Sequence, residues 1–162
     1  MAIDWSPMDR RGPSVTEAAV AAFEAQLGVT LPDDYRAFLL DVNGGRTSRS
    51  HTVFRIRKSQ TILNSLNSLD EQDEQFDLAT QWQRARAWLP KEVIPAGYDD
   101  GGGTVALVVA GPRRGQVWFL DGVDPRPEGS NPRVEWFDRR DVSKVADSFR
   151  EFMTTLTPLD AP

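Results

Sequence analysis

The segment Leu31–Gly45 constrains the fold most, because it encodes a short helix together with both of its ends. Pro32 suits the first helical turn, where a missing N–H is tolerated, and the two aspartates after it favour the positive end of the helix dipole. One apolar face follows at spacings of three and four, formed by Tyr35, Phe38, Leu39 and Val42. Asn43-Gly44-Gly45 then ends the helix, because glycine adopts the left-handed backbone of a C-cap without a Cβ clash. The sequence therefore predicts a capped amphipathic helix over 32–43.

The composition limits the classes of protein to which this chain can belong. A chain of 162 residues fits one domain with a proper core, and the absence of cysteine excludes disulfides, thiolate nucleophiles and cysteine-ligated zinc. The net charge of −5 argues against direct nucleic-acid binding, which needs a cationic surface, and fits a basic protein partner. The sequence shows neither a signal-peptide pattern nor an apolar run of membrane-spanning length. We therefore expect a cytoplasmic protein that does not bind membranes.

Capping signals and a 3.6-residue periodicity predict three more helices. The spacing of Ser14-Val15-Thr16-Glu17 is that of a capping box, which opens a helix to Leu27 with Gly28 as its stop. An inserted helix is expected over 76–88. A C-terminal helix is expected over 141–156, where apolar residues recur at helical spacing: Val145, Phe149, Phe152 and Leu156. Residues 1–13 lack periodicity and are expected to form a flexible leader, and residues 157–162 a C-terminal tail.

Period-two alternation and glycine-rich turns predict the strands. Short connections favour antiparallel pairing among neighbouring strands. Residues 60–77 fit either a short helix or a strand followed by a turn. The expected strands are 52–57, 92–98, 104–109, 115–120 and 134–137. The element order indicates a single α+β domain over 14–156, with an antiparallel sheet packed by an N-terminal helix pair, one inserted helix and a C-terminal helix.

Five short motifs along this domain resemble one family. They are Gly28–Pro32, Asp34–Leu39 with Asn43-Gly44-Gly45, Ile94-Pro95 leading into Asp99–Gly102, Gly115–Phe119 followed by Asp121, and Ala146–Phe152. In this order they resemble the SUKH superfamily, in the branch named after the fungal cell-wall-assembly regulators. The stretch 59–75 and the proline-rich insert 124–133 depart from the family's pattern.

The resemblance implies a protein-binding domain without catalytic activity. Bacterial members of the family are similar to immunity proteins, which bind and neutralise a cognate toxin, often a nuclease. Fungal relatives act as interaction hubs. The resemblance thus implies an immunity protein, and the alternative is a regulatory or scaffolding module without a toxin partner.

Catalytic motifs receive little support from the residues. His51 is the only histidine, so any Ser-His-Asp triad must use it, and the neighbouring Ser48 and Ser50 lie in the same loop. Gly101-Gly102-Gly103 lacks the Gly-Lys-Ser/Thr ending of a phosphate-binding loop and reads as a hairpin turn. We expect no enzyme activity, no cofactor and no metal.

Four aspartates at strand ends are the candidate partner-binding residues: Asp99, Asp100, Asp121 and Asp124. Hairpin topology places alternate turns at opposite ends of a sheet, so the 99–103 turn and the loop after Leu120 are expected to share one end. Two acidic loops together would suit a metal ion or the basic cleft of a nuclease. The alternative is that aspartate before glycine is simply turn chemistry. We expect these residues to bind a toxin domain with a basic cleft.

Overall fold

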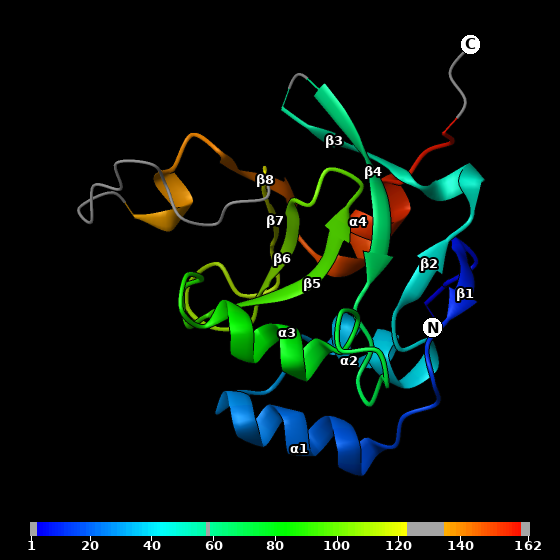
Figure 1. Cartoon of the computed structure of the whole chain (residues 1–162), viewed down its shortest axis with the longest axis vertical. Coiled ribbons are helices and arrows are strands. Elements are labelled where there is room, and N and C mark those ends of the chain that lie inside the picture. Colours follow the sequence, from blue (N-terminus) through cyan, green and yellow to red (C-terminus); the bar gives the residue numbers. More distant parts are fainter. Residues whose placement is uncertain (1–2, 58, 123–134, 160–162) are drawn as a thin grey trace.

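The computed structural model describes residues 3–57, 59–122 and 135–159 (Figure 1). Within them eight strands form an antiparallel sheet in the order β1-β2-β4-β5-β6-β7-β8, with β3 paired to β4 outside this path. The strands are β1 (Met8–Arg11), β2 (Gly45–Thr47), β3 (Val53–Ile56), β4 (Ser59–Leu66), β5 (Val93–Asp99), β6 (Thr104–Val108), β7 (Val117–Leu120) and β8 (Val142–Ala146). The helices are α1 (Glu17–Leu27), α2 (Asp33–Asp41), α3 (Leu78–Ala85) and α4 (Phe149–Thr155), with 3-10 turns η1 (Arg49–His51) and η2 (Trp136–Asp138). The predicted single α+β domain with an antiparallel sheet is confirmed.

The segment Leu31–Gly45, which we call the signature segment, forms α2 inside the predicted bounds 32–43. Its N-cap is Pro32, and after the helix the backbone turns left-handed at Asn43, Gly44 and Gly45, with φ of 56°, 77° and 111°. β2 begins at once with Gly45. The motif therefore ends a helix and also starts a strand.

Strand β4 settles the segment 60–77, which the sequence left open. β4 pairs with β3 on one side and with β5 on the other, and an irregular loop connects it to α3. The strand alternative is the correct one for the first part of this segment.

The expectation of a flexible leader is wrong for residues 5–11. β1 pairs with β2, and the side chain of Trp5 is 5% exposed and donates a hydrogen bond from Nε1 to the carboxylate of Asp41 at 3.1 Å. The following helix is capped by Thr16, whose Oγ1 accepts from the Ala19 N–H, and not by Ser14. In the expected tail, Thr157 pairs with Val53 of β3.

The expected helix over 141–156 is two elements. Residues 142–146 form β8, because β7 offers a partner edge that outweighs helical propensity in a segment with two valines. α4 begins only after Ser148, whose Oγ accepts from the Glu151 N–H, while the Glu151 carboxylate accepts from the Asp147 N–H. These two bonds cap α4, which begins at Phe149, shortly after β8 has ended at Ala146. The prediction of a strand over 134–137 is wrong for the part that the structure describes, because residues 136–138 form the 3-10 turn η2.

Alternate residues of β6 enter two hydrophobic clusters, one on each face of the sheet. Val105 and Leu107 belong to the main cluster with α1, α2 and α4, and Ala106 and Val108 to a smaller one beside η2 and the end of α3. An aromatic group fills the centre of the main cluster and consists of Trp5, Tyr35, Phe38, Phe149 and Phe152. This core fixes α2 and α4 against the sheet.

Tyr35 in that group is fully buried, and its hydroxyl has no hydrogen-bond partner within the described residues. Burial raises the pKa of Tyr35 above the ordinary value of 10.0, so above pH 10 the unfolded chain ionises first and stability falls. Tyr35→Phe should not lower stability at pH 7, since an unsatisfied hydroxyl is removed, and should reduce the alkaline loss. Urea denaturation at pH 7 and pH 10.5 measures both effects. A marked loss at pH 7 would contradict the orphaned hydroxyl.

Candidate functional site

The register of the central strands places Asp99, Asp100 and Asp121 at one end of the sheet. Thr104 pairs with Tyr98 on one side and with Leu120 on the other. The 99–103 turn and Asp121 therefore lie next to each other, as hairpin topology predicts. Asp124 lies outside the described residues.

Asp99 does not offer its carboxylate to a partner, and this part of the expectation needs correction. Its side chain is nearly buried, with the residue 7% exposed. Oδ1 accepts from the Gly103 N–H at 2.6 Å, and Oδ2 accepts from Thr61 Oγ1 at 2.7 Å. Asp99 thus shapes the β5–β6 turn and ties it to β4.

Asp100 and Asp121 are exposed, and each has polar or charged neighbours. Asp100 accepts a hydrogen bond from Asn64 Nδ2 at 3.0 Å. Asp121 lines a shallow groove of about 230 Å³ together with Arg57 and Arg140. This end of the sheet therefore carries mixed charge.

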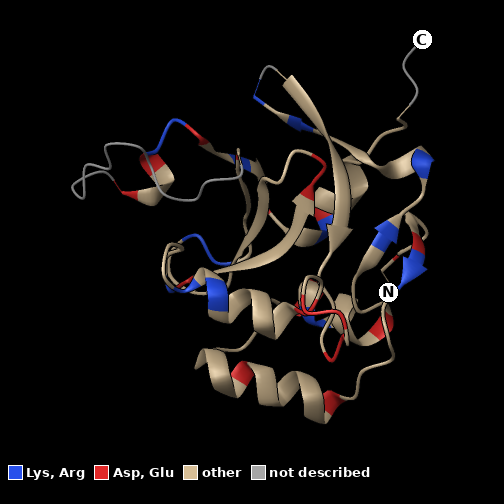
Figure 2. Cartoon of the chain, viewed as in Figure 1, with Lys and Arg blue, Asp and Glu red and all other residues tan. Residues whose placement is uncertain are grey.

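A stronger concentration of acids lies in the loop between β4 and α3. We call residues 70–77 the acidic loop. Its acids Asp70, Asp73 and Glu74 are exposed and Glu71 is half-buried. Figure 2 shows these acidic positions gathered on the loop that precedes α3. From the sequence alone these acids are expected to be a solvated run, and no pattern in the sequence indicates that the loop is ordered.

Asn43, from the signature segment, anchors the start of this loop. Its Nδ2 donates to the carbonyls of Leu69 and Pro13, at 2.8 and 2.7 Å, and its Oδ1 accepts from the Leu69 N–H at 2.8 Å. Asn43 is 1% exposed, so these bonds are protected from water. A Cβ at Gly44 would lie 2.5 Å from the carbonyl oxygen of Asn67, so only glycine permits this close approach.

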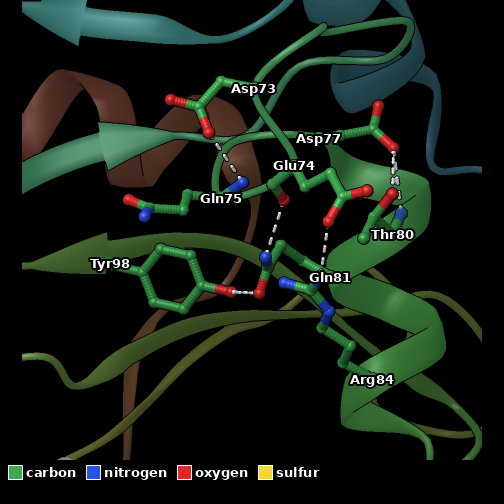
Figure 3. A network of polar contacts seen from close by, with 8 residues as sticks. All are labelled: Asp73, Glu74, Gln75, Asp77, Thr80, Gln81, Arg84 and Tyr98. Atoms are coloured by element: carbon green, nitrogen blue, oxygen red, sulfur yellow. Dashed lines mark hydrogen bonds and ion pairs between the residues drawn. The ribbon is translucent and has the colours of Figure 1, made fainter.

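The other end of the loop is held by α3 (Figure 3). The Asp77 carboxylate caps the helix by accepting from the Thr80 N–H at 3.0 Å and from its hydroxyl at 2.6 Å. Gln81 Nε2 donates to the Glu74 carbonyl at 2.8 Å, and its Oε1 accepts from Tyr98 of β5 at 2.7 Å. Arg84 pairs with the Glu74 carboxylate at 2.8 Å. The acidic loop is therefore fixed to both the helix and the sheet.

The only histidine of the chain, His51, lies close to a serine. Ser48 Oγ lies 3.3 Å from His51 Nδ1, a contact that the short η1 turn produces by itself, since residues i and i+3 eclipse in a 3-10 helix. Among the described residues no group of three or more His, Asp or Glu side chains is arranged to hold a metal ion. No helix of the described part is long and apolar enough to cross a membrane.

The fold and the site define a small α+β domain that holds an ordered acidic loop at its surface. The chain belongs to the SMI1/KNR4 family (SUKH-1), whose family model matches residues 14–155. Members of this family are generally non-catalytic. Comparison with curated proteins finds no match. The family match begins at residue 14, so β1 precedes the matched region.

Proposed function

We propose that this chain is an immunity protein that acts in the cytoplasm by binding and neutralising a cognate toxin. The observation that carries the proposal is the acidic loop, which presents four acids on a segment fixed to both α3 and the sheet. Family membership supports a protein partner in general. The basic cleft of a nuclease toxin is the surface that complements such a loop, because nucleases bind phosphate through cations.

Order in the loop matters for affinity. An inhibitor whose charges are already positioned loses less conformational entropy on binding than one with a mobile acidic segment. Complementary charge also accelerates encounter and excludes wrong partners. Asp100 and Asp121 stay in the proposal as a separate acidic contact at the sheet end, and Asp124 stays in it as a partner-binding residue, while Asp99 acts by holding the turn.

Two triple variants test which acidic surface binds. Asp70→Asn, Glu71→Gln and Asp73→Asn remove three charges from the acidic loop but keep oxygens that accept the loop's own hydrogen bonds. We expect association with the toxin encoded by the neighbouring gene to slow on the order of tenfold at low salt, with a flatter salt dependence. Stopped-flow kinetics at low and high salt measure both quantities.

The second triple variant is Asp100→Asn, Asp121→Asn and Asp124→Asn, which changes net charge by the same amount and should slow association less than the loop variant does. Equal slowing in both variants would show that the acidic loop has no larger part in association than the other three aspartates. An unchanged rate in the loop variant would remove the loop from the interface. Failure of the unaltered chain to bind the toxin would overturn the immunity function in favour of a regulatory or scaffolding module.

A further inference from the structure

We propose that the chain carries a second recognition site, a groove across β1, β2 and β4 that receives an acidic side chain from an extended segment of a protein partner. We call it the arginine groove. It measures about 240 Å³, and its lining includes Arg10, Arg11, Arg46, Ser65 and Phe76. The proposal does not depend on the partner's being a toxin.

The first observation is a pair of neighbouring arginines that form no ion pair with the described part of the chain. Arg10 of β1 and Arg46 of β2 are direct cross-strand partners, and both are exposed. Like charges directly opposite each other destabilise an antiparallel pair. Neither arginine forms an ion pair within the described residues, and Arg11 has only a 3.4 Å hydrogen bond to the Asp41 carbonyl. An anion between Arg10 and Arg46 would relieve their repulsion.

The second observation is a buried hydroxyl in the same lining. Ser65 is 4% exposed, and within the described residues its Oγ has no hydrogen-bond partner. A buried polar group without a partner is costly, and such groups are exceptional in folded proteins. A ligand carboxylate in the groove would accept a hydrogen bond from Ser65 while the guanidinium groups supply charge and planar donors.

The size and remaining lining of the groove select the ligand. A volume of about 240 Å³ is below the usual range of pockets for free small molecules and fits one side chain. Glu71 and Asp73 also line the groove, and they disfavour a phosphate dianion more than a single carboxylate. Phe76 adds apolar surface for the carbon stem of such a side chain.

The groove lies across three strands, because Arg10 belongs to β1, Arg46 to β2 and Ser65 to β4. Neighbouring strands are about 4.8 Å apart, so a segment paired with the free edge of β1 would lie too far from Ser65 for a glutamate side chain to reach it. The partner segment therefore crosses the face of these strands, with its glutamate in the groove. Figure 2 shows the basic residues of β1 and β2 beside the acidic loop, so one partner segment can meet both charges.

The test titrates the full chain with a defined probe, the capped peptide acetyl-Thr-Val-Glu-Val-Thr-amide. The amide NMR signals of the chain report the binding. We expect saturable shifts confined to β1, β2 and the neighbourhood of Ser65. Arg10→Gln with Arg46→Gln should weaken binding at least tenfold. The matched control, Arg55→Gln with Arg150→Gln, removes two exposed arginines elsewhere and should leave binding within twofold.

Ser65→Ala separates a binding role from a structural one. If Ser65 serves the ligand, the substitution weakens peptide binding severalfold and leaves the unfolding midpoint unchanged, because no hydrogen bond within the described part is lost. The site is overturned if the shifts are absent at 10 mM peptide, if they spread over the whole surface, or if both arginine pairs behave alike. Equal binding of the same peptide with glutamine in place of glutamate would overturn the carboxylate assignment. Tighter binding of inorganic phosphate would do the same.

Discussion

Replacing Phe38 or Phe149 by alanine should lower the free energy of unfolding by about 3–5 kcal/mol in each case. Both side chains are fully buried, with ring centroids 4.8 Å apart, and Trp5 packs on Phe38 at 5.2 Å. Each truncation removes transfer free energy and leaves a cavity between α2 and α4 that the packed neighbours cannot fill. Urea denaturation at pH 7 measures the change through the unfolding midpoint at constant slope.

Phe137 provides a control of the same residue type. It is half-buried and packs against Trp118 in the smaller cluster. Phe137→Ala should therefore lower the free energy of unfolding clearly less than the substitutions of Phe38 and Phe149 do. The double variant of Phe38 and Phe149 should lose less than the sum of the two single losses, because the rings share one contact and one cavity. Small shifts of the midpoint for both single variants would show that this aromatic group is not the centre of the core.

The second large effect is expected for Asn43→Ala, which should lower the free energy of unfolding by about 3 kcal/mol. The substitution leaves the Leu69 N–H and the carbonyls of Leu69 and Pro13 without their partner in a site closed to water. It also puts alanine at a φ of 56°, a conformation that asparagine tolerates better. Denaturation gives the global loss, and amide hydrogen exchange at Leu69 and Asp70 should show faster opening of the acidic loop.

Asn64→Ala is the matched control for Asn43. Asn64 donates one hydrogen bond to Asp100 in an exposed setting, so its loss should cost less than about 1 kcal/mol. Unchanged exchange at Leu69 in Asn43→Ala would mean that the acidic loop is held from α3 alone. In that case the signature segment would not position the proposed binding surface.

The parts of the fold that could be predicted are those whose signals lie close together in the sequence. The N–H groups and carbonyls at helix ends need partners within a few residues, so proline, acidic residues and glycine around α2 suffice to predict that element. Glycine-rich turns likewise predict the antiparallel pairing of β5, β6 and β7. The Ser148–Glu151 cap was readable too, but the helical spacing that begins at Val145 obscured it.

Contacts between distant segments decided the rest. The sequence by itself determined α2, its cap and the central strands, because their signals are local. β1 and β2 have four and three residues and exist through pairing across more than thirty positions, which leaves no periodicity to read. Asp99 looks like an exposed turn residue until Thr61 of β4 reaches it. Only the tertiary structure gathers Arg10, Arg46 and Ser65 at one groove and lets Asn43 hold the acidic loop, since the side-chain bonds and packing of both sites join segments that are far apart in the chain.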